Sequence, residues 1–221
     1  MQLSDDVNVV VIEPSAVLLT PVAHLLEYPK LIELAGRTCY KSEDRITHDS
    51  ARRFILGIIK RGHESVIEHC SVTYRIICSR ACSHQLVRHR IAAYSQESQR
   101  YCDYKNEFQI IVPPSVKQDI NLYYNFVDSA QRAYMDYRKL REAGVKPEDA
   151  RFLLPNCAKT EVVVTYNLRQ WRHVINQRID PHAQWEIRKI MKSILYELDH
   201  YIPVFFEDIV KRLNEDRKDG L

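Results

Sequence analysis

The chain has 221 residues, of which 45% are hydrophobic and 28% are charged, and its formal net charge at pH 7 is only +3. This length suits one domain with a substantial core, and the composition is that of an ordinary globular protein without low-complexity tracts or repeats. The small net charge argues against a general polyanion-binding protein.

The sequence carries no signal for a membrane or for export. No apolar run approaches the roughly 20 residues of a membrane-spanning helix, and the N-terminus has Asp5 and Asp6 where a signal peptide needs basic residues. We therefore expect a cytoplasmic protein without a membrane partner. Its six cysteines are then expected to be reduced thiols rather than a disulfide framework: Cys39, Cys70, Cys78, Cys82, Cys102 and Cys157.

In the first half of the chain, periodicity and cap residues predict three strands and two helices. The strands are valine-rich residues 6–12, alternating residues 71–78, and residues 108–112 before a Pro-Pro pair. One helix begins after Thr47 as N-cap, has an apolar stripe over residues 51–58, and has Gly62 just past its end. The other helix begins after Ser79 as N-cap and runs through Arg90.

In the second half, apolar spacings of three and four predict a long helix from Ile120 to Tyr137, with Gly144 as its stop. Residues 147–154 predict a short helix, residues 161–166 a strand, and residues 168–178 and 185–198 two more helices. This order predicts an α+β fold with a central, mostly antiparallel sheet flanked by several helices. No linker divides the chain, so we expect one domain over residues 1–221.

The five glycines form neither G-x-G-x-x-G nor G-x-x-x-x-G-K-[ST], so the sequence lacks a Rossmann fingerprint and a P-loop. Any phosphate group must then be held by side chains and helix N-termini. Arginine can supply this contact, because its rigid guanidinium matches phosphate oxygens in pairs.

Basic residues gather in two places. Between Arg75 and Tyr101 there are five arginines and one acid, and between Thr165 and Arg178 there are three arginines and no acid. Two such clusters in a nearly neutral chain indicate a site for a compact anion and fit a long nucleic-acid track less well. A solvated basic helix end is the simpler alternative for the first cluster.

In the first cluster, a helix through Arg90 would place Gln85, Arg88 and His89 within one turn, with Arg88 and Arg90 on different sides. Residues 94–100, expected as a loop, offer hydroxyls and amides next to Arg100. Amides beside arginines suit the edge of a nucleobase that is attached to a phosphate.

In the second cluster, Arg169, His173 and Asn176 fall at i, i+4 and i+7 of the predicted helix and share one face. Such a face can hold a large heteroaromatic ligand, and Arg178 at the helix end can reach into a cleft. A solvent-facing polar helix is the alternative, but such a helix usually contains acids, and none occurs before Asp180.

Two His and Cys patterns suggest metal sites but fail on spacing. His63 and His69 are six residues apart, whereas H-E-x-x-H needs a pair at i and i+4. Cys78, Cys82 and His84 are irregularly spaced across a strand-to-helix junction, which favours buried thiols over a zinc cluster. We expect no metal ion.

Taken together, these residues resemble the flavin-dependent thymidylate synthases. Arg88-His89-Arg90, followed after seven residues by Ser98, matches the R-H-R-x7-S signature of that family. Flanking motifs agree in order and spacing over about residues 60–187: Gly62-His63-Glu64, Glu68-His69, Ala150-Arg151, Leu154-Pro155-Asn156, Asn167-Leu168-Arg169 and His182-Ala183-Gln184-Trp185-Glu186.

The resemblance implies reductive methylation of dUMP to dTMP, with 5,10-methylenetetrahydrofolate as carbon donor and NADPH as the reductant of bound FAD. It also implies a homotetramer in which each active site draws residues from several subunits, without a nucleic-acid partner. In that family no enzymic nucleophile is needed, because the flavin takes part in both reduction and carbon transfer.

Carried over position by position, the resemblance implies one catalytic residue and two binding sets. The catalytic residue is Arg178. The FAD-binding set is Ser65, Arg88, His89, Arg90, Gln96, Asn167, Leu168, Arg169 and His173. The dUMP-binding set is Gln85, Leu86, Val87, Arg88, Gln96, Glu97, Ser98, Gln99, Arg100, Arg151 and Arg178.

The chain departs from the family pattern at a few positions. Members often have Asn-Glu where this chain has Ser95-Gln96, and Gly where it has Gln99, so a carboxylate is missing at position 96. Position 65 is commonly Thr in the family.

Two other interpretations stay open. Asn156-Cys157 superficially resembles the context of the nucleophile in the unrelated, cysteine-dependent thymidylate synthases; we expect Cys157 to be a buried structural thiol. A non-catalytic nucleic-acid-binding module would predict steeply salt-dependent oligonucleotide binding and no chromophore.

Overall fold

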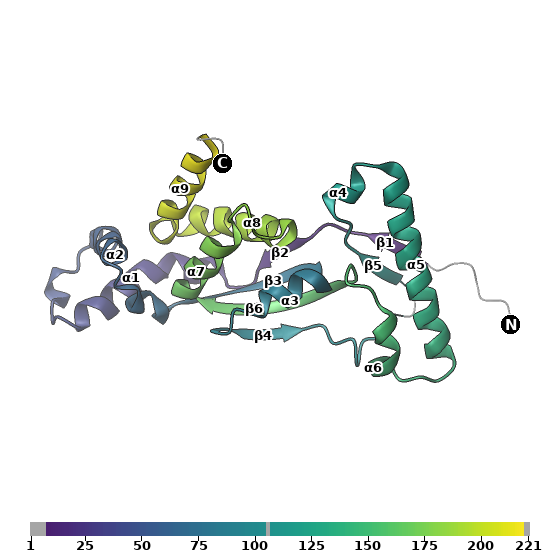
Figure 1. Ribbon diagram of the computed structural model, residues 1–221. Coiled ribbons are helices and arrows are strands. Elements are labelled where there is room, and N and C mark those ends of the chain that lie inside the picture. Colours follow the sequence, from purple (N-terminus) through teal and green to yellow (C-terminus); the bar gives the residue numbers. More distant parts are fainter. Residues whose placement is uncertain (1–7, 105–106, 219–221) are drawn as a thin grey trace. The chain divides into compact units, whose positions relative to one another are not determined.

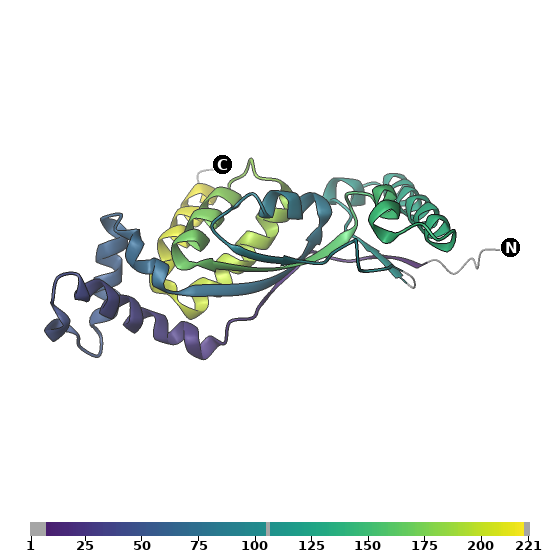
Figure 2. The same cartoon turned by 90° about the horizontal axis from the view of Figure 1, so that it is seen from below.

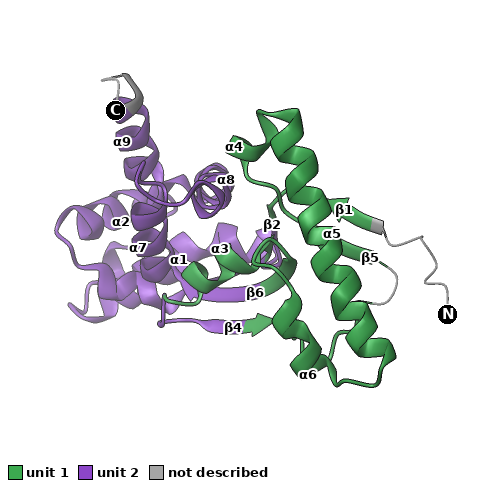
Figure 3. Ribbon diagram, turned by 45° about the vertical axis from the view of Figure 1, so that its right-hand side comes forward, with its two compact units in different colours: residues 1–15, 76–88, 95–162 green, residues 16–75, 89–94, 163–221 purple. Residues whose placement is uncertain are grey.

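The computed structural model describes residues 8–104 and 107–218. The chain folds into two compact units, which Figure 3 colours separately. Unit 1 contains Met1–Ser15, Ile76–Arg88 and Ser95–Val162, and unit 2 contains Ala16–Arg75, His89–Tyr94 and Val163–Leu221. The expectation of a single domain over residues 1–221 stays a prediction.

A four-stranded sheet has the order β2-β3-β6-β4. Its two long central strands, β3 and β6, are antiparallel, because Leu168 N donates to Cys70 O at one end and Arg80 N donates to Ala158 O at the other. Both strands alternate buried and more exposed residues, as the sequence pattern predicts. The α+β class with an antiparallel sheet is therefore confirmed. The strands are β2 (Ser15–Leu18), β3 (Ser71–Ser79), β4 (Ala93–Gln96) and β6 (Lys159–Asn167).

In unit 1, a short parallel pair packs under the longest helix. β1 (Asn8–Val11) pairs with β5 (Glu107–Ile110), so that Val9 lies opposite Phe108. α5 (Ile120–Glu142) lies alongside both strands (Figure 1) and packs Tyr134 and Tyr137 into a core with Phe108. This confirms the predicted long helix. The Asp119 carboxylate caps it by accepting from Asn121 N and Leu122 N. Shorter helices of this unit are α3 (Arg80–Leu86), α4 (Pro114–Lys117) and α6 (Pro147–Ala150).

Unit 2 is mainly helical. α1 (Val22–Thr38) and α2 (Ser50–Lys60) lie side by side (Figure 2). α7 (Leu168–Arg178) packs on β3 through Trp171, which is fully buried and donates its indole N–H to Val72 O. α8 (Trp185–Tyr201) and α9 (Glu207–Lys218) complete the unit. α7 and α8 confirm predicted helices, whereas β2, α1, β4 and α9 had no counterpart in the prediction.

Within the described residues, no helix combines the length and the apolar character that a bilayer-spanning segment requires.

Several predicted boundaries were wrong. The N-cap of α2 is Asp49 rather than Thr47. The helix expected to reach Arg90 ends at Leu86, and residues 94–96, expected as loop, belong to β4. The strand predicted over residues 108–112 covers only Glu107–Ile110, and residues 6–7 of the first predicted strand lie outside the described residues.

Contacts outside the helix hold the segment after α3. In a helix through Arg90, His89 O would be one of the last four carbonyls, which have no partner inside the helix; here it accepts the Tyr94 hydroxyl at 2.9 Å. The His89 side chain is turned inward and is only 7% exposed. Arg88, His89 and Arg90 therefore lie in a non-helical segment, and the predicted arrangement of Arg88 and Arg90 on two sides of a helix is wrong.

The contact between α1 and α2 depends on Gly36, because a Cβ there would lie 2.5 Å from Phe54 Cζ. The Arg37 guanidinium lies over the Phe54 ring, 5.0 Å from the ring centroid, and helps to hold the ring in place. Gly36→Ala should therefore lower the free energy of unfolding by about 1–3 kcal/mol, despite the roughly 1 kcal/mol by which helix propensity favours Ala.

Gly57→Ala in α2 is the matched control, because its new Cβ would meet only the flexible Arg61 guanidinium at 3.3 Å. This variant should be as stable as the wild type or more stable by up to about 1 kcal/mol. Urea unfolding measures both variants. Equal stability of the two alanine variants would contradict the close packing at Gly36.

Candidate functional site

In unit 1, the predicted nucleotide-binding residues begin at a capped helix. β3 ends at Ser79, whose hydroxyl accepts from Cys82 N at 3.0 Å and starts α3. Along α3, Gln85 is half-buried and Leu86 is buried in the core. The Leu86 side chain therefore anchors α3 in the core. At this position a ligand would contact the backbone or a neighbouring residue.

Gln96 is held by two buried hydroxyl groups. Its amide nitrogen donates to Ser83 Oγ at 2.9 Å and to Thr160 Oγ1 at 3.2 Å. Ser83 and Thr160 are 0% and 1% exposed, so both hydroxyls lie in the interior. An amide suits this position because it can donate to both oxygens, which an ionised carboxylate cannot do.

Two predicted substrate arginines meet at one residue of α6. Arg100 Nε donates to Glu148 Oε2 at 3.0 Å, and Arg151 Nε donates to Glu148 O at 3.1 Å. Arg100 lies within a turn: Ser98 O accepts from Cys102 N at 2.9 Å, and Ser98 Oγ accepts from Arg100 N at 3.2 Å. The structure thus brings Ser98, Arg100 and Arg151 to one place, with two guanidiniums in preset orientations.

In unit 2, the predicted catalytic arginine is fixed by a histidine. Arg178, the last residue of α7, donates its Nε–H to His89 Nε2 at 2.9 Å. The His173 ring lies 6.3 Å from the His89 ring, centroid to centroid. Burial, followed by the charges of Arg178 and His173, lowers the pKa of His89 to about 4. His89 is therefore neutral at pH 7 and accepts the hydrogen bond that orients Arg178.

Two tyrosines hold the backbone of this histidine. The hydroxyls of Tyr94 and Tyr166 lie 2.6 Å apart, and Tyr94 also donates to His89 O. Burial raises the pKa of both phenols, so both stay protonated at neutral pH. Tyr166 belongs to β6, which continues into Asn167, and the Asn167 side chain caps α7 by accepting from Gln170 N at 2.8 Å.

The arginines of α7 do have acidic partners, although none is nearby in the sequence. Arg169 pairs with Glu68 at 2.6 Å, and Arg172 contacts Glu64 at 3.5 Å. Both acids lie in the short 3₁₀ helix Glu64–His69. This is the segment in which His63 and His69 fail the H-E-x-x-H spacing. The absence of local acids in the sequence is therefore offset by charge partners from a remote element.

A cationic cavity of about 880 Å³ lies between α1, α2 and the segment that follows α1. It contains Ser65, one of the predicted cofactor residues, and among the described residues that line it Asp44 is the one acid. The basic lining attracts anions, and the Ser65 hydroxyl adds a donor. This lining fits the diphosphate of a dinucleotide. His63 of the Gly62-His63-Glu64 motif is part of this lining, but sequence reasoning missed its other basic residues: Arg37, Lys41, Arg45 and Arg61.

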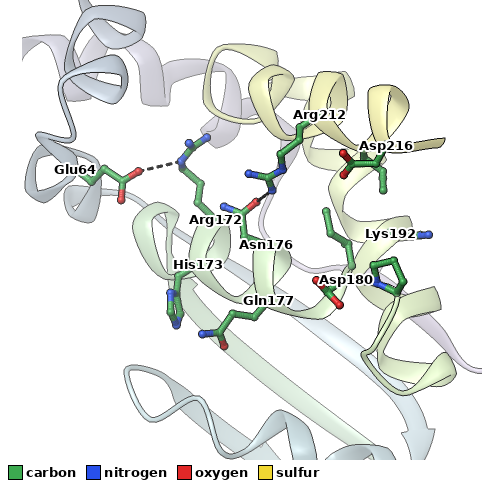
Figure 4. A pocket seen from close by; sticks show the side chains of 12 residues that line it. Glu64, Arg172, His173, Asn176, Gln177, Asp180, Lys192, Arg212 and Asp216 are labelled. Atoms are coloured by element: carbon green, nitrogen blue, oxygen red, sulfur yellow. Dashed lines mark hydrogen bonds and ion pairs between the residues drawn. The ribbon is translucent and has the colours of Figure 1, made fainter. Parts of the chain in front are cut away.

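A second cavity, of about 490 Å³, is lined mainly by residues of α7, α8 and α9 (Figure 4). Arginines of its lining are bound by other side chains: Arg172 pairs with Asp208 at 2.7 Å and contacts Glu64, and Arg212 donates to Asn176. Figure 4 shows His173 directed away from Arg172 and Asn176. Of the three residues predicted to share one helix face, His173 and Asn176 both line this cavity, and Arg169 pairs with Glu68.

The predicted residues fall into two sets, one in each unit. Unit 1 contains Gln85, Leu86, Val87, Arg88, Gln96, Glu97, Ser98, Gln99, Arg100 and Arg151. Unit 2 contains Ser65, His89, Arg90, Asn167, Leu168, Arg169, His173 and Arg178. The first set is mostly the predicted dUMP set and the second mostly the predicted FAD set.

The cysteine and metal alternatives gain no support. Burial raises the pKa of the Cys157 thiol to about 11, so little reactive thiolate exists at neutral pH. Among residues 8–104 and 107–218, no three His, Cys, Asp or Glu side chains are grouped so that they could hold a metal ion.

Fold and side-chain geometry together define an α+β protein with preset arginines and a cationic cavity suited to phosphorylated ligands. The family model described as thymidylate synthase complementing protein matches residues 22–204, and the chain belongs to this family. Relatives named flavin-dependent thymidylate synthase are similar to it over most of their length, which confirms the resemblance inferred from the motifs.

Three such relatives illustrate the similarity. The protein from Pyrococcus furiosus is 40% identical over 177 residues, 78% of this chain and 72% of the relative. That from Geobacter sulfurreducens is 40% identical over 185 residues, 80% of each chain. That from Mycobacterium sp. (strain JLS) is 38% identical over 200 residues, 80% of this chain and 78% of the relative.

The neutral state of His89 predicts how stability depends on pH. In the unfolded chain histidine has its ordinary pKa near 6.5, so between that value and about 4 the unfolded state binds more protons than the folded state. The free energy of unfolding should therefore fall as pH decreases through this window, by roughly 1–3 kcal/mol from this residue.

His89→Gln is the comparison, because the Gln oxygen can accept from Arg178 without titrating. Urea unfolding of both proteins at pH 7 and pH 4.5 measures the effect. The wild type should lose more stability than the variant on acidification. An identical loss in the two proteins would contradict a neutral, buried His89.

Proposed function

We propose that the protein is a flavin-dependent thymidylate synthase. It converts dUMP, 5,10-methylenetetrahydrofolate, NADPH and a proton into dTMP, tetrahydrofolate and NADP⁺. The observation that carries this function is family membership over residues 22–204, and the activity is the one for which the relatives are named. The arginines fixed by Glu148 and His89 support it, because a phosphorylated pyrimidine needs such contacts.

FAD fits the residues of unit 2. The cationic cavity around Ser65 would hold its diphosphate, and His89, Arg90 and the α7 residues would bind the rest. Bound FAD would supply the redox chemistry that NADPH feeds, which the side chains alone cannot perform. The proposed FAD set is the one implied by position: Ser65, Arg88, His89, Arg90, Gln96, Asn167, Leu168, Arg169 and His173.

The phosphate of dUMP fits the residues that meet at Glu148. Arg100 and Arg151 offer charge-assisted hydrogen bonds, and the Ser98 turn adds a hydroxyl. Gln96, held by buried Ser83 and Thr160, presents its amide oxygen as an acceptor for the substrate or the cofactor.

Arg178 acts on the uracil ring. Uracil is a weak nucleophile at C5, and a form of the ring that carries negative charge toward N3 and O2 attacks the carbon donor more readily; a nearby guanidinium would stabilise that charge. The hydrogen bond from Arg178 Nε to His89 fixes the orientation of this cation before the reaction. Arginine does not lose its proton in proteins, so the role is electrostatic rather than that of a general base.

The homotetramer rests on the resemblance, whereas the single domain and the cytoplasmic setting rest on the sequence pattern. We propose a single catalytic domain over residues 1–221 that forms a homotetramer with shared active sites, in the cytoplasm and without a nucleic-acid partner. Size-exclusion chromatography with light scattering tests the tetramer, and the salt dependence of oligonucleotide binding tests the competing nucleic-acid function.

The activity assay combines purified protein with FAD, dUMP, methylenetetrahydrofolate and NADPH and measures dTMP by chromatography. We expect dTMP in amounts equal to the NADPH oxidised, and none when any component is omitted. Flavin-loaded protein that oxidises NADPH but forms no dTMP under any condition would contradict the proposed function.

Arg178→Ala should lower the turnover number at least about a hundredfold, as removal of an oxyanion donor does. Arg132→Ala on α5, which removes an exposed pair with Asp128, is the control and should leave turnover unchanged. Steady-state dTMP formation measures both variants. Turnover within a few-fold of the wild type in Arg178→Ala would rule out the assigned role.

A further inference from the structure

The segment from Gln96 to Arg100 is attached to β6 by three successive residues. Lys159 Nζ donates to Glu97 Oε2 at 3.0 Å, Thr160 Oγ1 accepts from Gln96 at 3.2 Å, and Glu97 N donates to Glu161 O at 2.9 Å. The proposed phosphate residues Ser98 and Arg100 follow directly. The contacts that hold Gln96 and Glu97 therefore determine the positions of Ser98 and Arg100.

Glu97 is the only acid between Arg88 and Tyr101, and both of its oxygens are occupied. Oε1 accepts from the Tyr104 hydroxyl at 2.9 Å, and Oε2 accepts from Lys159. The Glu97 and Lys159 side chains are 16% and 15% exposed, so water screens this pair only partly. The carboxylate is bound by the chain itself.

Tyr104 is a rigid donor for this carboxylate. Its backbone oxygen accepts the Tyr134 hydroxyl at 2.5 Å, and its ring packs against Phe108 and Tyr137 at 5.8 and 6.2 Å between ring centroids. Burial, followed by the charge of Glu97, raises the pKa of the Tyr104 hydroxyl, which stays protonated at neutral pH. The α5 core thus holds Glu97 from one direction and β6 from the other.

Lys159 is fully charged, because its bonds to Glu161 and Glu97 outweigh burial and raise its pKa. It binds Glu161 Oε1 at 2.7 Å as well as Glu97, so one ammonium group on β6 holds two carboxylates. Without it, Glu97 would be an uncompensated carboxylate three residues before Arg100. Such a group competes with a phosphate for the guanidinium and repels a dianion.

We propose that Lys159 is a positioning residue for nucleotide binding: it neutralises Glu97 and holds it on β6, so that Ser98 and Arg100 stay available to the substrate phosphate. The inference rests on the proposed function, because it takes the phosphate of dUMP as the ligand. Tyr104 supports the same arrangement through the second carboxylate oxygen.

The test measures the dissociation constants of dUMP and of 2′-deoxyuridine from the change they cause in the absorption of protein-bound FAD. Lys159→Met should weaken dUMP binding at least about tenfold and change deoxyuridine binding less than about twofold, because deoxyuridine lacks the phosphate. Lys159→Arg, which keeps the charge and two donors, should bind dUMP within about threefold of the wild type.

A double variant separates charge compensation from general damage. Lys159→Met combined with Glu97→Gln removes the uncompensated acid and should bind dUMP more tightly than Lys159→Met alone. Lys139→Met, which removes an exposed pair with Asp136 on α5, is the control and should bind both ligands as the wild type does. If Lys159→Met does not fold, Lys159→Gln keeps a donor without the charge and takes its place.

Three results would overturn the proposal: unchanged dUMP affinity in the neutral Lys159 variants, an equal loss for dUMP and deoxyuridine, or no recovery in the double variant. Failure of the wild type to respond to dUMP would instead contradict the proposed function, and this inference with it. The wild-type titration therefore distinguishes the two failures.

Discussion

The antiparallel pairing of β3 and β6 fixes nearly every proposed site residue. Backbone bonds join Leu168 to Cys70 at one end of the pair and Arg80 to Ala158 at the other. Each strand then ends in a residue that caps the next helix, Ser79 for α3 and Asn167 for α7. Because side chains alternate with a period of two, a slip of one residue would turn the buried side chains of the slipped strand to the other face of the sheet.

The strand β6 also supports the non-helical segment between these helices. Lys159, Thr160 and Glu161 hold Gln96 and Glu97, and Tyr166 holds Tyr94, whose hydroxyl binds His89 O. The R-H-R signature is therefore supported by β6 as well as by the end of α3, where Arg88 N donates to Gln85 O. The motif and the strand that supports it lie far apart in the sequence but act together.

The arginines of the protein are oriented by partners of different charge. Arg100 has Glu148 and Arg169 has Glu68, so each has a carboxylate. Arg178 donates its Nε–H to a neutral His89, which fixes the direction of its guanidinium. A low net charge of +3 is thus compatible with strong local fields.

Strong periodicity made part of the fold predictable. α5, α7 and α8 followed from apolar spacing, and β3 followed from alternation. α1 contains Pro29 inside the helix, and β2 and β4 have only four residues each, so their local patterns were too weak or interrupted. Helix α9 is mostly polar and has little apolar stripe. In these segments tertiary packing decides the structure.

The site residues were predictable by motif but their contacts were not. The bond between Arg169 and Glu68 joins residues 101 positions apart, and that between Lys159 and Glu97 joins residues 62 positions apart. No local pattern encodes such pairs, because they arise only when remote elements come together in the fold. The cationic cavity was missed for the same reason: Arg37, Arg45 and Arg61 come from three segments that meet only in the fold.

The most direct test of a flavin-dependent thymidylate synthase is the visible absorption spectrum of the purified protein, recorded after addition of FAD and again after dUMP. We predict a protein-bound flavin band that dUMP shifts to saturation, because the bound nucleotide and the flavin share one active site in the proposed reaction. A protein that retains no FAD, or a flavin band that dUMP leaves unchanged, would contradict this function.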